Sequence, residues 1–258
     1  MESSSTASAE ASTAAASVQP ICARDSRPSL DETAHRVACD VGGVWHLADW
    51  ISPDEEADLT ARIYSEHNQD WTKLRDRRLL HLGGSPCDAL GQGIDREPLP
   101  SWAQAVCDEL VQRGIFPEKA PPNHVLLNEY MPGQGITAHK DGPLYASRVA
   151  VLSLGSHTTF QFLRAAGGAT DEKTSLLLPP RGMLVFAGAE AYTQHLHTVP
   201  PLKEDDLLLP GLVRLDGTQA ARADSAEAAG QQQRFLPRQR RLSLTLRRLR
   251  YKWEKDTI

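Results

Sequence analysis

One segment near the end of the chain constrains the fold strongly, because it alternates strictly between polar and apolar side chains. Arg, Ser, Thr and Arg occupy one parity of residues Arg241 to Arg247, and three leucines occupy the other. Successive side chains of a β-strand point to opposite faces, so this pattern predicts a strand between two different environments. We expect the leucines to pack in a core between layers and the polar side chains to face a cavity. An edge strand with an exposed charged face is the alternative.

Two helices are predicted before the strand-rich part of the chain. A short strand at Val44 to Ile51 leads into Ser52-Pro53-Asp54-Glu55. This tetrapeptide combines a serine cap, a proline at the first helical position and a glutamate three residues after the cap. The second helix begins at Pro100-Ser101-Trp102 and ends near Gly114, because glycine is a common C-terminal stop.

After Pro121-Pro122 the sequence changes to short strand patterns separated by turns. About eight short strands after two helices predict a mainly β (α+β) domain. Its architecture would be a double-stranded β-helix, or jelly roll, with supporting N-terminal helices. The predicted strands are His124–Tyr130, Ile136–Lys140, Arg148–Leu154, Thr158–Leu163, Ser175–Leu178, Met183–Ala187, Tyr192–Val199 and Arg241–Leu249.

The first part of the chain is predicted to be a tail. Ser, Ala and Thr dominate residues 1–18 of the 258-residue chain, with no hydrophobic periodicity. Such a stretch buries too little apolar surface to offset the entropy lost on ordering. We therefore expect a disordered tail over residues 1–40, with a transit peptide as the alternative, and one domain over residues 41–258. Within that domain, an Ala- and Gln-rich stretch predicts a flexible insertion at about 203–237.

Composition narrows the compartment and the partners. The four cysteines are widely spaced and form no C-x-x-C pair, which is typical of reduced thiols in a cytoplasmic or nuclear protein. No apolar run is long enough for a membrane span, and we expect a monomer. From Arg234 onward the chain has nine Lys and Arg but only two Asp and Glu, while the rest is acidic. This basic C-terminal segment could contact phosphate groups. The alternative, which the sequence favours equally, is that it forms a solvated charged surface.

His139 and Asp141 are candidate metal ligands. They lie two residues apart on a predicted strand, so their side chains point to the same face. A distant histidine would complete the set of two histidines and one carboxylate that leaves open positions on non-haem Fe(II). His195 and His197 both qualify, and because they share strand parity, periodicity does not choose between them.

The polar face of the strand at 241–247 suits a dicarboxylate ligand. Arg241 and Arg247 flank the hydroxyl groups of Ser243 and Thr245. Arginine binds carboxylates through two parallel hydrogen bonds, which favours an acid with a carboxylate at each end. The two ends of this face are roughly 20 Å apart at the backbone, so both guanidinium groups must lean inward to reach one small acid.

Together these residues resemble the AlkB-type Fe(II)/2-oxoglutarate dioxygenases. The spacing N-x-Y-x8-H-x-D, a distal histidine and R-x5-R matches that family from Asn128 to Arg247. The resemblance covers roughly Val44 to Arg248 and is greater still to one branch, the AlkB homologue six proteins. The segments shared with that branch are Trp71-Thr72-Lys73, Leu82-Gly83-Gly84, Asn123-His124-Val125-Leu126, Asp141-Gly142-Pro143-Leu144-Tyr145 and Ser153-Leu154-Gly155-Ser156-His157-Thr158.

The resemblance implies a role for each ligand of the iron. Fe(II) would be bound by His139, Asp141 and His197, with 2-oxoglutarate and O2 as co-substrates. His197 is preferred to His195 because a small residue and a β-branched residue follow the distal histidine of the family. Thr198 stands where the family commonly has glycine, which is a mild departure.

The resemblance also implies how 2-oxoglutarate is held. Asn128 and Arg247 would bind its C1 end, with Arg247 also near Asp141. Tyr130 and Arg241 would bind its far carboxylate. Asn128 and Tyr130 share strand parity, which that arrangement requires.

The resemblance favours an alkylated nucleic acid, RNA or DNA, as the substrate to be hydroxylated or demethylated. Members that act on nucleic acids flip a base into the pocket and cover it with a lid. The corresponding region here is basic, and Pro143 stands where repair members tend to have polar residues. The alternatives are a protein side-chain hydroxylase or demethylase, and a nucleic-acid-binding module of the same fold with low activity. The candidate lid and substrate residues are Lys73, Arg75, Arg77, Arg78 and Tyr145.

Overall fold

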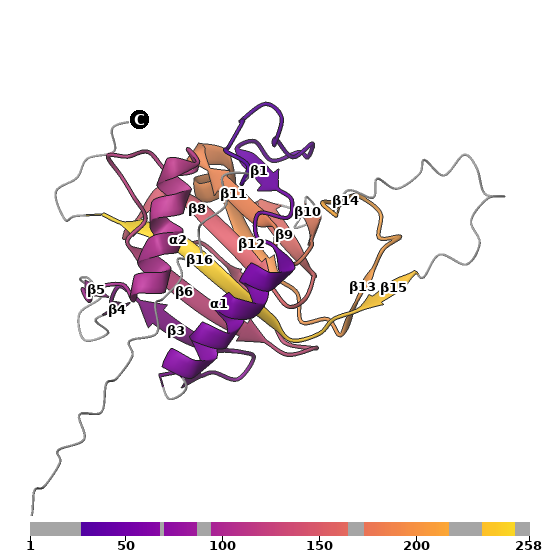
Figure 1. The fold of residues 1–258 in the computed structure, drawn as a ribbon. Coiled ribbons are helices and arrows are strands. Elements are labelled where there is room, and N and C mark those ends of the chain that lie inside the picture. Colours follow the sequence, from indigo (N-terminus) through magenta and orange to yellow (C-terminus); the bar gives the residue numbers. More distant parts are fainter. Residues whose placement is uncertain (1–26, 68–69, 87–93, 165–172, 217–233, 251–258) are drawn as a thin grey trace, which may run out of the picture.

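Two large β-sheets and two α-helices form the main body of the computed structural model, which describes residues 27–67, 70–86, 94–164, 173–216 and 234–250 (Figure 1). The larger sheet has seven strands and the smaller has five. None of the helices in these ranges is long and apolar enough to cross a membrane. In order across the larger sheet, the strands are β1 (Val44–Leu47), β11 (Met183–Ala187), β8 (Tyr145–Leu154), β16 (Arg241–Leu249), β6 (His124–Tyr130), β3 (Arg78–Leu82) and β2 (Thr72–Lys73).

The smaller sheet faces the larger one and completes the jelly roll that the sequence predicts. Two further pairs of short strands lie outside the two sheets. In order across the smaller sheet, the strands are β14 (Leu212–Arg214), β10 (Lys173–Leu178), β9 (Thr158–Arg164), β12 (His195–Val199) and β7 (Ile136–His139). The short pairs are β13 (Glu204–Asp206) with β15 (Phe235–Pro237), and β4 (Ser85–Pro86) with β5 (Ile94–Asp95).

Strand β16 lies at the centre of the larger sheet, between β8 and β6, so it is not an edge strand. Its three leucines are buried beneath α1 (Pro53–Glu66) and α2 (Ser101–Gln112), which cover the outer face of the sheet (Figure 1). A second apolar cluster, which includes Val151, Phe160 and Phe186, lies between the two sheets. The predicted alternation is therefore confirmed, and the leucine core lies between the helices and the larger sheet.

The start of α1 is the predicted capping arrangement. The hydroxyl of Ser52 accepts a hydrogen bond from the backbone N–H of Glu55 at 3.1 Å. The Glu55 carboxylate accepts one from the backbone N–H of Ser52 at 2.7 Å. Such a cap stabilises a helix by about 1 kcal/mol, and it fixes where α1 begins over the sheet.

The predicted boundary of the tail at residue 40 is wrong for the residues that the structure describes. Arg27 is buried, forms an ion pair with Glu55 and lies over the ring of Trp50, 4.5 Å from the ring centroid. Val37 is buried in the cluster between the sheets. Paired charges and a few apolar side chains anchor this segment, which composition alone does not reveal. The Ser- and Ala-rich residues 1–26 lie outside the described part.

The predicted flexible insertion at about 203–237 is also wrong in its described parts. Strands β13 and β15 pair with each other, and β14 extends the smaller sheet next to β10. Asp205 is fully buried and accepts hydrogen bonds from Arg238 at 2.6 and 2.8 Å and from the hydroxyl of Thr159 at 2.5 Å. This buried charge network holds the β13–β15 pair against β9. Residues 217–233 lie outside the described part.

The strand predicted at Tyr192–Val199 begins only at His195. The preceding segment, η1 (Ala189–Gln194), is a single stretch of π-helix. Gly188 starts it with a φ of 83°, a conformation that glycine adopts without strain. As a result His195 and His197 lie at the start and the middle of β12.

Candidate metal and dicarboxylate site

A cavity between the two sheets collects most of the candidate site residues from four strands and one loop. Strands β6 and β16 contribute the polar face of the larger sheet, and β7 and β12 contribute histidines from the smaller one. Its polar lining residues are Asn128, Tyr130, His139, Asp141, His197, Arg241, Ser243 and Thr245, and its apolar lining residues are Leu126, Ile136, Val151, Phe160, Phe186 and Val199.

Three of these residues form a cluster that could hold one metal ion. Ligand atoms of His139, Asp141 and His197 all lie within 4.8 Å of one another. His139 and His197 are direct partners in the antiparallel β7–β12 pair, and their ring centroids are 4.4 Å apart. Strand β7 ends at His139, so Asp141 lies in the loop just after it, where Gly142 turns the chain with a φ of 84°.

The donor atoms of this cluster suit a metal cation. His139 donates its Nδ1–H to the carbonyl oxygen of Thr137 at 2.9 Å, which leaves Nε2 free to bind a metal. Burial lowers the pKa of His197 to about 4, so its imidazole is neutral and can act as a ligand at neutral pH. Asp141 uses Oδ1 to accept from Arg247 at 2.5 Å, while its buried Oδ2 has no hydrogen-bond partner among the described residues. A buried carboxylate oxygen without a partner is costly, and a cation beside two imidazoles would satisfy it.

The other end of the cavity holds a buried guanidinium group. Arg241 is 3% exposed, and its Nη2 donates to the hydroxyl of Ser153 at 2.8 Å and to that of Ser243 at 3.3 Å. Its Nε and Nη1 have no partner within the described ranges. Burial lowers the pKa of Arg241 to about 10, so the group still carries its charge at neutral pH. A carboxylate ligand fits these donors, because a buried cation needs a hydrogen-bonded counter-charge.

The remaining candidates for 2-oxoglutarate line the walls of the cavity. Asn128 and Tyr130 are buried on β6, opposite Ser243 and Arg241 of β16. The Oδ1 of Asn128 accepts a hydrogen bond from Nε of Arg77 at 2.9 Å. Arg77, which the sequence suggests as part of a lid, therefore contacts the wall of this cavity directly.

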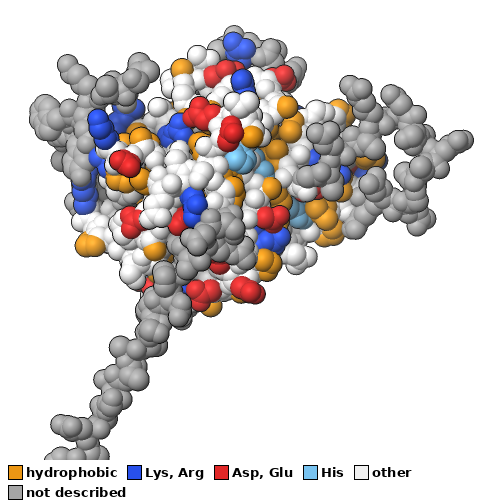
Figure 2. All heavy atoms as spheres, turned by 45° about the horizontal axis from the view of Figure 1, so that its top comes forward, with side chains coloured by type: hydrophobic (Ala, Val, Ile, Leu, Met, Phe, Trp, Pro, Cys, Tyr) orange, Lys and Arg blue, Asp and Glu red, His pale blue; other side chains and the backbone are white. Residues whose placement is uncertain are grey.

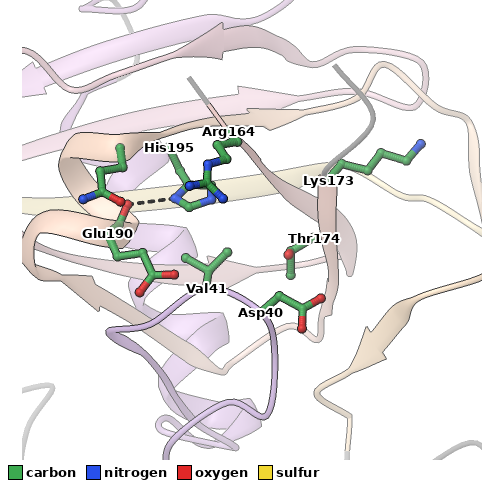
Figure 3. Close-up of a pocket in the computed structure, with 8 residues that line it drawn as sticks. Asp40, Val41, Arg164, Lys173, Thr174, Glu190 and His195 are labelled. Atoms are coloured by element: carbon green, nitrogen blue, oxygen red, sulfur yellow. Dashed lines mark hydrogen bonds between the residues drawn. The ribbon is translucent and has the colours of Figure 1, made fainter. Parts of the chain in front are cut away.

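His195 lies in a different cavity from His197 (Figure 3). It is buried and donates its Nδ1–H to the carbonyl oxygen of Glu190 at 2.8 Å. Arg164 lies beside its ring, and Glu190 and Asp40 lie at the opposite wall of a cavity of about 450 Å³. Of the two histidines that periodicity leaves open, the structure brings His197 to the other two candidate ligands, His139 and Asp141.

Four of the five candidate lid and substrate residues, all of them basic, lie on the β2–β3 hairpin at the edge of the larger sheet. Lys73 is exposed, and Arg75 pairs with the neighbouring Asp76. Arg78 forms an ion pair with Glu129 and lies 4.7 Å from the ring centroid of Trp71. On the face of the molecule shown in Figure 2, Lys and Arg side chains are interspersed with Asp and Glu side chains and do not form one large basic patch.

Tyr145 is not on this hairpin. It is the first residue of β8 and is buried, with the guanidinium carbon of Arg247 3.9 Å from its ring centroid. It therefore lies beside the Asp141–Arg247 pair and not on the surface that the hairpin presents.

Sequence reasoning missed two polar residues that contact the site. Ser153 is the single hydroxyl residue in the apolar second half of β8, residues 149–154, and lies directly opposite Ser243. His124 shares strand parity with Asn128 and Tyr130 and lies opposite Arg247. Parity could have found His124, since it extends the polar face of β6 by two steps.

A jelly roll with two histidines and one carboxylate beside a buried arginine defines a class of protein, the non-haem iron oxygenases that use a 2-oxo acid. Comparison with known proteins agrees. The pattern of the 2OG-Fe(II) oxygenase superfamily matches residues 91–247. The chain therefore belongs to this superfamily, in its AlkB-type group, and is a dioxygenase that uses Fe(II), 2-oxoglutarate and O2.

Named relatives come from several organisms. The zebrafish (Danio rerio) protein described as "Probable RNA/DNA demethylase ALKBH6" is 35% identical over 212 residues, which cover 79% of this chain and 84% of that protein. The Xenopus tropicalis protein described as "tRNA (carboxymethyluridine(34)-5-O)-methyltransferase alkbh8" is 28% identical over 170 residues, covering 63% of this chain and 26% of that protein. The solved structure of OsALKBH1 shares the fold, with a TM-score of 0.52 and 17% identity, covering 80% of this chain and 96% of that one.

Proposed function

We propose that this dioxygenase hydroxylates or oxidatively demethylates an alkylated nucleic acid, with Fe(II) bound by His139, Asp141 and His197. The observation that carries the assignment of the site is the cavity itself. At one end of the cavity, an oxygen of Asp141 has no hydrogen-bond partner among the described residues. At the other end, two donor nitrogens of the buried Arg241 have none among them either. A metal ion and a dicarboxylate would satisfy both ends at once.

The side chains divide the work of binding. Arg241, supported by Ser153 and Ser243, would bind the far carboxylate of 2-oxoglutarate, with Tyr130 beside it. Asn128 and Arg247 would bind the C1 end. Thr245 lies between the two on the same face of β16.

When bound, Fe(II) and 2-oxoglutarate supply the O2-dependent oxidation of a C–H bond, and hydroxylation of an N-methyl carbon releases formaldehyde. The chain contributes position and environment. His139 presents Nε2 because Thr137 holds Nδ1, and Arg247 holds one oxygen of Asp141. The aromatic rings of Phe160 and Phe186 pack around His197 and exclude water from its inner side.

Support for a nucleic-acid substrate comes from relatives and from the position of the hairpin. The zebrafish relative is described as a probable RNA/DNA demethylase. The β2–β3 hairpin reaches the cavity wall through Arg77 and exposes Lys73 to solvent, which suits a lid over a flipped base. The basic C-terminal segment is a second candidate for phosphate contact, although residues 251–258 lie outside the described part. We propose that the enzyme acts as a monomer in the cytoplasm or nucleus, in keeping with the free thiols of Cys39 and Cys107.

A formaldehyde-release screen over methylated RNA, DNA and protein pools tests the substrate class. We expect release from a nucleic-acid pool with matching succinate production, and no release from protein. Release only from the protein pool would overturn the nucleic-acid proposal while leaving the dioxygenase intact.

Single replacements of the two β12 histidines test the metal site. Because His197 lies in the cluster and His195 does not, His197→Ala should abolish Fe(II) binding and succinate production, whereas His195→Ala should retain Fe(II). Loss of iron from His195→Ala alone would show that the ligand is assigned to the wrong histidine.

A further inference from the structure

The guanidinium group of Arg247 lies directly behind the candidate metal ligand Asp141. Its Nη1 donates to Asp141 Oδ1 at 2.5 Å, and both side chains are about 5% exposed or less. Its flat face rests on Tyr145, 3.9 Å from the ring centroid. The position of Arg247 therefore decides which carboxylate oxygen of Asp141 is engaged and which faces the two histidines.

A third group, His124, holds this guanidinium from the side of β6. It is fully buried and lies directly opposite Arg247 in the β6–β16 pair. Its Nδ1 lies 3.5 Å from Nη2 of Arg247. Since a guanidinium group can only donate, Nδ1 of His124 must accept, and the ring proton must be on Nε2.

The neighbour on the other side of the ring fits the same tautomer. Nε2 of His124 lies 3.3 Å from Nδ1 of His81, which can accept its proton. Burial, and then the charge of Arg247, lower the pKa of His124 to about 3, so the imidazole remains neutral at physiological pH. A neutral ring with a fixed acceptor nitrogen is the form that a buried guanidinium group requires beside it.

We propose that His124 is a positioning residue that fixes Arg247, and through it Asp141, so that Oδ2 of Asp141 faces the metal. This inference rests on the proposed role of Asp141 as a metal ligand. If the acceptor on His124 is removed, a buried N–H of Arg247 loses its partner and the guanidinium group turns to find another. The Asp141 carboxylate then loses its fixed orientation, and affinity for the metal falls.

A purely structural role predicts something different. The ring of His124 packs against His81 and Tyr145, with centroids 5.5 and 5.4 Å away. If packing were the only role, any side chain of similar size would serve. The acceptor atom, and not the shape, is what the positioning role requires.

Three variants separate these roles, with Mn(II) as a probe that is followed by the EPR signal of the free ion. His124→Leu keeps most of the volume but has no acceptor, and His124→Asn places an amide oxygen where Nδ1 lies. Loss of a direct partner of a metal ligand typically weakens metal binding about 10- to 100-fold. Because His124 acts one step further away, through Arg247, we expect Mn(II) to bind about 10-fold more weakly to the leucine variant. The asparagine variant should stay within about threefold of wild type. His46→Leu, which alters another largely buried imidazole outside the cavity, should bind Mn(II) as wild type does.

Each outcome decides the question. If the leucine variant unfolds at 25 °C, His124→Gln replaces it, because its amide lies where Nε2 is and cannot accept from Arg247. Wild-type affinity in a folded variant without the acceptor overturns the proposal, as does an asparagine variant as weak as the leucine variant. Failure of the wild-type chain itself to bind Mn(II) overturns the proposed metal site, and the role of His124 with it.

Discussion

The two faces of β16 share one backbone and differ in how their side chains are satisfied. Leu242, Leu244 and Leu246 are at most 3% exposed and pack against the residues of α1 and α2. On the opposite face, Arg241 and Arg247 are buried to the same degree. Yet three of their nitrogens have no hydrogen-bond partner within the described part of the chain.

This difference separates the face of the strand that stabilises the fold from the face that we propose binds a ligand. The leucine face finds all of its contacts inside the chain, so it contributes to stability whether or not a ligand is bound. The polar face places charge in a low-dielectric cavity, which costs stability unless a counter-charge arrives. Substitutions on the leucine face should therefore change the free energy of unfolding, and substitutions on the polar face should change the KM for 2-oxoglutarate.

Leu244→Ala should cause a large loss of stability. Leu244 is fully buried, and removing its side chain leaves a cavity beneath the helices. We expect the free energy of unfolding to fall by about 2–5 kcal/mol in urea titrations. The KM for 2-oxoglutarate of the protein that remains folded should be unchanged. A large rise in KM with little loss of stability would break the distinction between the two faces.

Arg241→Met should show the opposite pattern. Loss of the hydrogen bonds from a charged donor should weaken the binding of 2-oxoglutarate by about 1.5–3 kcal/mol. This corresponds to a rise of roughly 10- to 100-fold in its KM. Stability without ligand should hold or rise. The folded pKa of Arg241 is about 10, below its ordinary value, so the burial cost is fully present at neutral pH and lessens only as pH rises above 10.

Arg238→Met is the matched control for that variant. Arg238 is buried like Arg241, but it forms two hydrogen bonds with the fully buried Asp205. Its removal leaves an uncompensated carboxylate, so we expect a loss of about 3–5 kcal/mol of stability and little change in KM. If both arginine variants lose stability equally, the idea that Arg241 serves a ligand is wrong.

The same contrast explains what the sequence can and cannot predict. Strand β16 could be predicted from the sequence because its two faces differ in polarity at every position from residue 241 to residue 247. The capped start of α1 was readable because Ser52, Pro53 and Glu55 act locally. The packing of Arg27 was hidden because its partner Glu55 lies 28 residues away. The order of the described parts of the 203–237 region was hidden for the same reason, since Asp205 depends on Arg238 and Thr159.

The candidate site shows the same limit. Strand parity predicted that His139 and Asp141 share a face, and that the polar residues of β16 share another. It did not choose between His195 and His197, because they lie two residues apart and their side chains point to the same face. Only the register of β12 against β7 brings His197 opposite His139. Strand β12 begins only after the π-helix at residues 189–194, and no local pattern in the sequence predicts that helix.

Ser153→Ala should have the smallest effect and sharpens the comparison most. The hydroxyl of Ser153 accepts a hydrogen bond from Arg241 at 2.8 Å. Removing the hydroxyl leaves the guanidinium charge in place but takes away one hydrogen bond that orients it. We expect a cost of about 0.5–1.5 kcal/mol, seen as a roughly two- to tenfold rise in the KM for 2-oxoglutarate. Ser175→Ala is the control, because its buried hydroxyl accepts from Gln161 at 3.0 Å on the smaller sheet, outside the cavity. Equal KM values for the two variants would mean that Arg241 is oriented without Ser153. A difference confined to Ser153 would show that the polar face of β16 extends its function onto the neighbouring strand β8.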